Sequence, residues 1–263
     1  MTAFDLDRIG GARALRRLVT EVLAAGEDAL CSYRDGAASR AQLKPDRSPV
    51  TEADHAAERR LRAHFDETFP DIGFLGEETG SREGTSGMRW LVDPIDGTRA
   101  FLRGIPTWSV LVGLEDEHGP AIGIAFMPSD GDLFVAVRGD GATGNGRPLR
   151  VSEVRSLGEA VVSHGGLNQF TTGGETRLLE RLGEGTFTQR GFGDFDGYRQ
   201  LVLGRIDAMV DPGVKPWDVC AAAVLVTEAG GRLTSLRGEP TIHAGSSLAS
   251  NGHLHDALLS LLG

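Results

Sequence analysis

The chain has 263 residues, of which 40% are hydrophobic and 24% charged, a composition typical of a globular protein with one large domain or two smaller ones. Its net charge of −10 at pH 7 argues against non-specific binding to nucleic acid, because such binding depends on neutralising phosphates with Lys and Arg. No apolar run approaches the roughly 20 residues that span a bilayer, and two cysteines are too few for a disulfide framework, so we expect a cytoplasmic protein with no membrane partner.

The N-terminal third is predicted to form two helices and a short strand. The first helix should end at Asp35-Gly36, and the second should begin near Pro49 and Thr51 and stop at Pro70. The short strand is expected within 72–78. The residues predicted to line the inward faces of the helices are Leu15, Leu18, Val22, Leu30, Ala57, Leu61 and Phe65.

The pattern then changes to strands separated by turns. Apolar runs at 108–114, 121–127 and 133–139 predict an antiparallel meander, and the Gly-rich segment 139–147 is predicted to be a turn. Beyond about residue 153 strand and helix patterns alternate, which suggests a sheet covered by helices. We therefore expect two closely packed parts, residues 1–152 and 153–263, the second one smaller.

The segment MRWLVDPIDGTRAFLRG (88–104) carries the strongest chemical signal. A short apolar strand runs into Asp93 and Asp96, Gly97 permits a tight turn, and Thr98 opens a short helix. Carboxylates just before a helix N-terminus suit an oxygen-preferring cation such as Mg²⁺, and the free amides suit a phosphate. The alternative is an ordinary Asp-rich turn, which residues 93–98 alone do not exclude.

Other acids lie in similar settings. Glu77-Glu78 follows an apolar strand, Asp218 precedes an apolar helix that it could also cap, and Asp54 lies near a helix start. Acids at the ends of buried elements are unfavourable unless something pairs with them, and the sequence shows no matching set of Arg or Lys nearby. A cluster of cations would resolve this, although each acid taken singly could be a cap or lie in solvent.

Three motifs in order, GEE (76–78), WLVDPIDGTRAF (90–101) and KPWDVCAAAVLVTEAGG (215–231), resemble the inositol monophosphatase superfamily of Mg²⁺-dependent, lithium-sensitive phosphatases. The resemblance covers nearly the whole chain. It implies an α+β fold with α-β-α-β-α layers, an antiparallel sheet in the N-terminal part and a smaller mixed α/β C-terminal part. It also implies a homodimer acting on a small phosphorylated metabolite.

The resemblance implies a site with two or three Mg²⁺ ions. Glu77, Asp93 and the backbone carbonyl of Ile95 resemble the ligands of the first ion, and Glu77 is also expected to hold a third, weaker one. Asp93, Asp96 and Asp218 resemble the ligands of the second ion. Glu78 is expected to support the ligands without binding an ion itself.

The resemblance also gives roles to residues around the ions. Thr98 and Asp54 match the pair that orients the water nucleophile, with Glu77 as the third catalytic residue. The amides of Gly97 and Thr98 match the phosphate cradle, where Asp96 and Asp218 should also contact the substrate. Hydrolysis would then proceed by attack of a metal-activated water.

The substrate must be selected elsewhere, and the segment from Gly193 to Tyr198 (GDFDGY) departs from the small residues usual in inositol monophosphatases. It is similar to the histidinol-phosphate phosphatase branch, which makes histidinol phosphate, an intermediate of histidine biosynthesis, the expected substrate. Asp194, Asp196 and Asp211 would favour its ammonium and imidazole groups. The residues assigned to substrate selection are Asp194, Asp196, Tyr198 and Asp211. Alternatively, Asp194 caps a helix and Tyr198 only packs.

Other activities stay open. They are hydrolysis of inositol 1-phosphate or of sugar phosphates in general, a nucleotide 3′-phosphatase, and a catalytically inactive metal-binding relative. The remaining candidates for chemistry have simpler interpretations. His118, His253 and His255 lack the spacing of metal ligands and are expected at the surface, whereas Cys220 lies within an apolar helix and is expected in the core.

Overall fold

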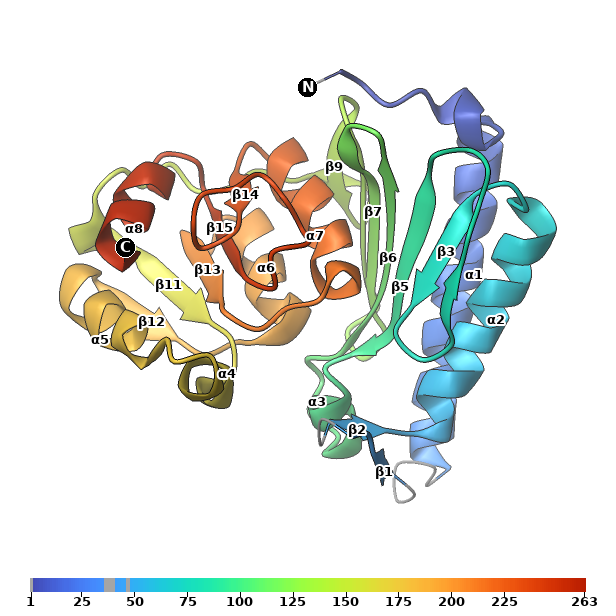
Figure 1. The fold of residues 1–263 in the computed structure, drawn as a ribbon, viewed down its shortest axis with the longest axis horizontal. Coiled ribbons are helices and arrows are strands. Elements are labelled where there is room, and N and C mark those ends of the chain that lie inside the picture. The colour runs from blue at the N-terminus through green and yellow to red at the C-terminus, as the bar shows by residue number, and fades with distance from the viewer. Residues whose placement is uncertain (1, 36–40, 46–47) are drawn as a thin grey trace.

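The computed structural model describes residues 2–35, 41–45 and 48–263, which form five layers (Figure 1). Helices α1 (Gly11–Arg34) and α2 (Glu52–Thr68) cover one face of an eight-stranded sheet. Helices α6 (Asp194–Val202) and α7 (Pro216–Glu228) lie between this sheet and a five-stranded sheet. The outermost layer is formed by α4 (Leu167–Thr172), α5 (Thr176–Gly185) and α8 (His255–Leu262). This arrangement confirms the predicted α-β-α-β-α fold.

The large sheet is a meander with one parallel pair. Its strand order is β10-β9-β8-β7-β6-β5-β3-β4, and all neighbours are antiparallel except β3 and β5. The bounds are β3 Gly73–Gly76, β4 Gly80–Arg82, β5 Arg89–Asp96, β6 Ser109–Asp116, β7 Gly119–Met127, β8 Asp132–Val137, β9 Gly141–Gly144 and β10 Arg147–Pro148. The predicted turn at 139–147 is therefore wrong in part, because this segment pairs with β8 and supplies two short strands at the edge of the sheet.

The apolar faces of α1 and α2 pack on this sheet as predicted. Leu18, Val22, Leu61 and Phe65 are fully buried, and the Phe65 ring stacks on that of Trp90 in β5, with 5.0 Å between centroids. Thr51 caps α2 in a capping box, which fixes the entry of the chain into this helix.

The smaller sheet is mixed, with strand order β12-β11-β13-β15-β14. Strands β12 and β11, and β11 and β13, are parallel, whereas β15 runs antiparallel to both of its neighbours. The bounds are β11 Val161–His164, α4 Leu167–Thr172, α5 Thr176–Gly185, β12 Thr188–Arg190, β13 Ala208–Asp211, β14 Arg232–Thr234, β15 Ser247–Ser250 and α8 His255–Leu262. The sequence interpretation missed α4 and β15.

Helix α7 joins the two parts of the chain. Its buried residues, such as Val219 and Cys220, share one hydrophobic cluster with Leu91 and Leu111 of the large sheet. The close approach needs glycine, since a Cβ at Gly123 would lie 2.4 Å from the carbonyl oxygen of Ala221. The core is therefore continuous between the two parts, and the boundary near residue 152 stays a prediction.

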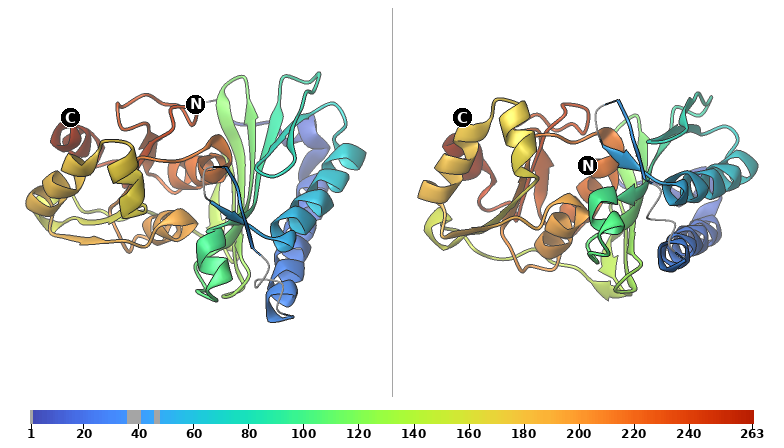
Figure 2. Two further views of the ribbon diagram at one scale, coloured as in Figure 1. Left: turned by 60° about the horizontal axis from the view of Figure 1, so that its bottom comes forward. Right: turned by 90° about the horizontal axis from the view of Figure 1, so that it is seen from below.

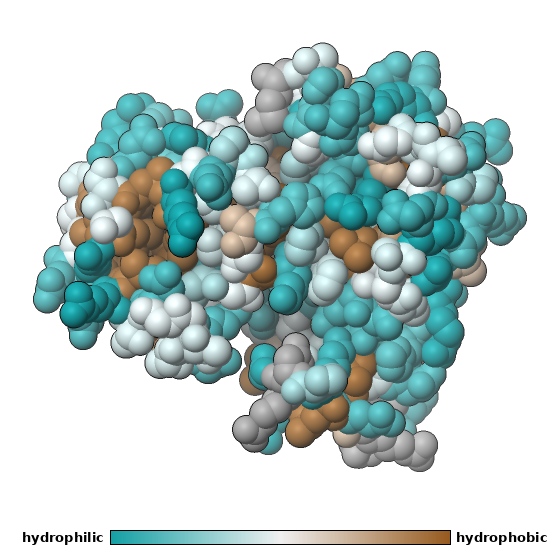
Figure 3. Space-filling view, in the orientation of Figure 1, coloured by the Kyte–Doolittle hydropathy of each residue, from teal (hydrophilic) through white to brown (hydrophobic). Residues whose placement is uncertain are grey.

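Short elements gather at one end of the large sheet. The strand pair β1 (Gln42–Leu43) and β2 (Pro49–Val50) lies beside the short helix α3 (Thr98–Leu102), as both views of Figure 2 show. The short 3₁₀ helices are η1 (Leu6–Ile9) and η3 (Leu157–Glu159). The surface is mostly hydrophilic on the face in Figure 3, and its hydrophobic areas include a hollowed one beside α8 and a smaller one near α3. Among the described residues, no helix is both long and apolar enough to span a bilayer.

Candidate active site

The end of strand β5 departs from regular pairing at the DPID segment. Its register against β6 shifts between Asp93 and Asp96, which are only 3% and 7% exposed. Asp93 accepts a hydrogen bond from the amide of Ile95 (3.1 Å), and Asp96 accepts two, from the hydroxyl of Ser109 (3.0 Å) and the amide of Phe195 at the start of α6 (2.8 Å). Gly97 then adopts φ +83° and starts α3. Both carboxylates are thus fixed at a point where the chain turns sharply.

Acids from distant elements line the same cavity, which has a volume of about 220 Å³. Glu77 follows β3, and Asp218 lies in the first turn of α7, where its Oδ2 accepts a hydrogen bond from the amide of Lys215 at 2.7 Å. The predicted site residues that line this cavity are Glu77, Asp93, Ile95, Asp96, Gly97, Thr98, Asp194 and Asp218. The fold therefore brings most of the predicted residues together.

The electrostatics of this cavity favour a bound cation. Burial, and then the neighbouring carboxylates, hold the pKa values of Asp93 and Asp96 well above the ordinary range of an aspartate. Burial is also the main cause that raises the pKa of Asp218 to about 8, and nearby acids, Glu77 first among them, add to it. A positive charge placed among these acids favours their ionised forms, so a cation would offset the repulsion between the carboxylates.

A lysine that the sequence interpretation missed supplies one such charge. Lys44 Nζ donates to Glu77 Oε1 at 2.7 Å and to Glu78 Oε1 at 2.6 Å. The expectation that no cation lies near these acids is therefore wrong for the two glutamates. The buried Glu58 of α2 was also missed, and it accepts hydrogen bonds from the amides of Glu78 (2.8 Å) and Thr79 (2.6 Å). Glu58 thereby fixes the turn that carries Glu77.

The oxygen atoms that line the cavity are of the chemical types that bind Mg²⁺. Carboxylate and carbonyl oxygens converge on the cavity, and these are the ligands that Mg²⁺ prefers. As the side chains stand, no group of three His, Cys, Asp or Glu residues in the described ranges is arranged to hold an ion. The ammonium of Lys44 occupies the oxygen atoms of Glu77 and Glu78, so it stands in for a cation at that end of the cavity. An ion that bound Glu77 Oε1 would compete with Lys44 for that oxygen.

The predicted pair for orienting water also forms. The hydroxyl of Thr98 lies 3.2 Å from Asp54 Oδ1 and 3.1 Å from the carbonyl oxygen of Ile95, and it can donate to either. The other oxygen of Asp54 accepts hydrogen bonds from the amide (2.8 Å) and the hydroxyl of Thr51. Burial raises the pKa of Asp54, which makes this carboxylate a better proton acceptor than an exposed one.

Of the four predicted substrate selectors, Asp194 alone lines the cavity. It adopts a left-handed backbone conformation (φ +44°), and its Oδ2 would lie 3.1 Å from a Cβ at Gly97. The N-cap residue of α6 is Gly193 and Asp194 is the first residue inside the helix, so the alternative that Asp194 caps α6 is wrong. Burial raises the pKa of Asp194, whereas Arg99 acts in the opposite direction. A strained non-glycine residue in a cavity is often held there for function.

The other three predicted selectors are buried behind the cavity. Asp196 pairs with Arg199 and accepts a hydrogen bond from Gln200 at 2.9 Å, and the hydroxyl of Tyr198 contacts that of Ser247 at 2.5 Å. Asp211 accepts a hydrogen bond from the amide of Gly213 at 3.2 Å, and burial raises its pKa to about 7. These partners favour structural roles for Asp196 and Tyr198.

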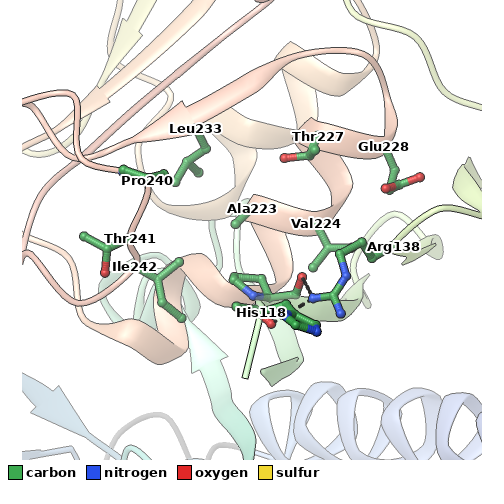
Figure 4. Close-up of a pocket in the computed structure, with 12 residues that line it drawn as sticks. His118, Arg138, Ala223, Val224, Thr227, Glu228, Leu233, Pro240, Thr241 and Ile242 are labelled. Carbon is green, nitrogen blue, oxygen red and sulfur yellow. Dashed lines mark hydrogen bonds between the residues drawn. The ribbon is translucent and has the colours of Figure 1, made fainter. Parts of the chain in front are cut away.

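Another cavity, of about 300 Å³, lies at the C-terminal half of α7, at the other end of this helix from Asp218 (Figure 4). Its walls are mostly apolar, and its charged groups are already paired. Arg138 donates to Asp116 and to backbone carbonyls, and Glu228 accepts from the amides of Gly139 and Gly141. This cavity therefore offers no free charge to a phosphate.

One histidine departs from its predicted place. The expected surface position of His255 is wrong, because its ring is buried within hydrogen-bond distance of Thr234 Oγ1 (Nε2, 3.0 Å) and Ser250 Oγ (Nδ1, 2.9 Å). Burial lowers its pKa to about 4. His118 and His253 do lie at or near the surface, and Cys220 is buried in α7 as predicted. None of these four residues lines the carboxylate cavity.

A comparison with known families decides the relationship: residues 13–263 match the model of the inositol monophosphatase family. The chain belongs to this family. It is 39% identical to a histidinol-phosphatase of Mycobacterium tuberculosis (91% of this chain, 95% of the relative) and 37% identical to one of Streptomyces coelicolor (93% and 95%). An inositol-1-monophosphatase of Rhizobium meliloti is 34% identical (94% and 95%).

The solved structures agree with this assignment. The inositol monophosphatase of Thermotoga maritima superposes with a TM-score of 0.84 at 29% identity, over 95% of this chain and 96% of that one. The relatives are named phosphatases, and their similarity extends over nearly the whole chain. This family member is therefore a phosphoric monoester hydrolase that acts on small phosphorylated substrates.

Proposed function

We propose that this chain is a Mg²⁺-dependent phosphatase that hydrolyses histidinol phosphate to histidinol and phosphate. The observation that carries the chemistry is the convergence of Glu77, Asp93, Asp96 and Asp218 on one cavity beside Gly97. The choice of substrate rests on the carboxylate of Asp194 at the same cavity and on the histidinol-phosphatases among the relatives.

The assignment of ligands to ions is the one that the family resemblance implies. Glu77, Asp93 and the carbonyl of Ile95 would hold one ion, Asp93, Asp96 and Asp218 a second, and Glu77 a weaker third. When bound, Mg²⁺ would neutralise the phosphate, lower the pKa of a bound water and stabilise the leaving oxygen. Burial raises the pKa values of these carboxylates when no ion is bound, and a bound ion would lower them.

The chain's own residues would then orient the attack. The hydroxyl of Thr98 can accept a hydrogen bond from the nucleophilic water while it donates its own proton toward Asp54 Oδ1. Asp54 is held by Thr51, so the Thr98 hydroxyl has a fixed partner. The backbone amides of Gly97 and Thr98, at the start of α3 and among the residues that line the cavity, would bind phosphate oxygens.

Asp194 would recognise the organic part of the substrate. Histidinol phosphate carries an ammonium group on the carbon next to the phosphate-bearing carbon, whereas inositol carries only hydroxyl groups. A carboxylate beside the phosphate cradle favours the ammonium by charge complementarity. Hydrolysis of inositol 1-phosphate, or of sugar phosphates in general, is the second candidate, and the relationship to the Rhizobium meliloti enzyme supports it.

Replacement of the metal ligands tests the chemistry. Purified Asp93→Asn and Asp218→Asn variants should release no phosphate from histidinol phosphate in Mg²⁺. Both should fold, and in EDTA they should unfold at the wild-type temperature or above it, because each change removes a buried acid whose ionisation burial and its neighbours oppose. Asp140→Asn, at an exposed position, is the control. Wild-type turnover in either ligand variant would overturn the assignment. The homodimer, the cytoplasmic location and lithium sensitivity stay predictions.

A further inference from the structure

A second cavity, of about 460 Å³, adjoins the carboxylate cavity. The segment between β11 and α4 lines one part of it, and the segment between β12 and α6 lines another. The two cavities share three lining residues, Arg99, Gln169 and Asp194, so they adjoin at these residues. None of the carboxylates assigned to the metals lines the second cavity, which leaves it available for the organic part of a substrate.

Two large hydrophobic side chains at this cavity are exposed to solvent. Leu167, at the start of α4, is 60% exposed, and Phe192, just before α6, is 39% exposed. Few large hydrophobic side chains in the described ranges are exposed to this extent, and these two line the same cavity from different segments of the chain. Exposed apolar side chains that gather at a cavity commonly mark a surface that a ligand covers.

Polar groups at the same cavity remain available. His164 Nδ1 lies 2.8 Å from the carbonyl oxygen of Gly165, which can only accept, so Nδ1 carries the proton. In the neutral ring Nε2 is then a free acceptor. The side-chain amide of Asn168 has no hydrogen-bond partner among the described residues. The cavity therefore combines apolar side chains with a free acceptor and a free amide.

We propose that this second cavity binds the imidazole ring of histidinol phosphate, with the ring face against Phe192 and Leu167 and the ammonium group at Asp194. This inference rests on the proposed function. A planar aromatic ring with nitrogen atoms at its edge fits a site that offers apolar faces and polar partners. A ring with a hydroxyl on every carbon, such as inositol, would leave its hydroxyls against Phe192 and Leu167 without partners.

The order of groups in the substrate matches the order of the two cavities. In histidinol phosphate a three-carbon chain separates the phosphate from the imidazole, and its middle carbon carries the ammonium. Asp194 lines both cavities and so lies where they meet, whereas Phe192 lines the second cavity alone. The order is therefore carboxylate cavity, Asp194, Phe192. One extended molecule can therefore place each of its three groups against a partner of suitable chemistry.

The test is a comparison of two substrates on matched variants. Histidinol phosphate has all three groups, whereas 2-aminoethyl phosphate has the phosphate and the ammonium without the ring. Phe192→Ala should lower kcat/KM for histidinol phosphate about tenfold, mainly through KM, and leave kcat/KM for 2-aminoethyl phosphate unchanged. Phe192→Tyr, which keeps the ring face, should stay within about twofold of the wild type for both substrates.

Phe187→Ala is the matched control, since Phe187 is 69% exposed and does not line the cavity. It should leave both values unchanged. Asp194→Asn should lower kcat/KM for both substrates, which separates ammonium recognition from ring recognition. Unchanged activity of the Phe192 variant toward 2-aminoethyl phosphate also shows that this variant is folded.

The outcomes separate the inference from the function beneath it. If the wild-type enzyme does not hydrolyse histidinol phosphate, the proposed function fails, and the imidazole site fails with it. If the wild-type enzyme does hydrolyse it but Phe192→Ala changes both substrates equally, or neither, the proposed function stands and the imidazole site is overturned.

Discussion

Replacing Glu58 with glutamine tests how the turn that carries Glu77 is held in place. Glu58 is buried in α2, and its carboxylate accepts the amide hydrogen bonds of Glu78 and Thr79 at 2.8 and 2.6 Å. The fit around it is tight, because a Cβ at Gly76 would lie 2.2 Å from Glu58 Oε1. Two amides next to a proposed metal ligand therefore depend on one distant carboxylate.

The expected loss follows from the number of acceptors. Glutamine keeps one carbonyl oxygen, so one of the two amides would face an NH₂ group and lose its partner. A hydrogen bond to a charged group contributes about 1.5–3 kcal/mol, so Glu58→Gln should lower the free energy of unfolding by about 2 kcal/mol. The loosened turn should also raise the Mg²⁺ concentration for half-maximal activity, because Glu77 is attached to it.

The assays are urea unfolding followed by circular dichroism and a Mg²⁺ titration of phosphate release. Glu67→Gln is the matched control, since Glu67 lies on the same helix at an exposed position. The control should leave both measurements unchanged. The reasoning would be refuted if Glu58→Gln unfolded within about 0.5 kcal/mol of the wild type and needed no more Mg²⁺.

Three further predictions concern other parts of the fold. Burial lowers the pKa of His255 to about 4, below the value of about 6.5 in the unfolded chain. The neutral ring therefore contributes its full share of the folding stability above pH 6.5, and this contribution is lost as the pH falls toward 4. Between pH 7 and 4 the wild type should lose about 3 kcal/mol more free energy of unfolding than His255→Gln, and equal losses in urea titrations would contradict this. Gly123→Ala should lower the free energy of unfolding by about 1–3 kcal/mol, because the new Cβ would meet the backbone of Ala221. Gly183→Ala is the control and should not lower the melting temperature, because a Cβ at this position in α5 meets open space. Lys44→Met should lower the Mg²⁺ concentration for half-maximal activity, since the lysine competes for two glutamates, and a higher requirement would argue against that competition.

The sequence could predict the features that depend on local pattern. Hydrophobic spacing predicted α1 and α2, and apolar runs between polar turns predicted the meander. The DPIDGT motif predicted the sharp turn at Gly97 because few other patterns combine two acids, a glycine and a helix start. The acids Glu77, Asp93, Asp96 and Asp218 were also predicted, since each follows or begins a buried element, whereas Asp194 was predicted from the resemblance to histidinol-phosphate phosphatases.

The features that were missed depend on contacts between distant residues. Lys44 meets Glu77 across 33 positions, and nothing in its own segment marks it as a partner. Glu58 is a charged residue on an amphipathic helix, which usually points to solvent, and its role appears only when β3 lies beside α2. The glycine-rich 139–147 segment forms β9 and β10 because β8 offers an edge to pair with. His255 is buried by β14 and β15, and β15 was itself missed.

The ratio of kcat/KM for histidinol phosphate to that for inositol 1-phosphate, measured on the wild-type enzyme in Mg²⁺, tests the central claim most directly. Asp194 beside the phosphate cradle, together with the aromatic side of the second cavity, predicts a ratio well above one. A ratio below one would contradict the account of the substrate, and no phosphate release from either compound would contradict the account of the site as well.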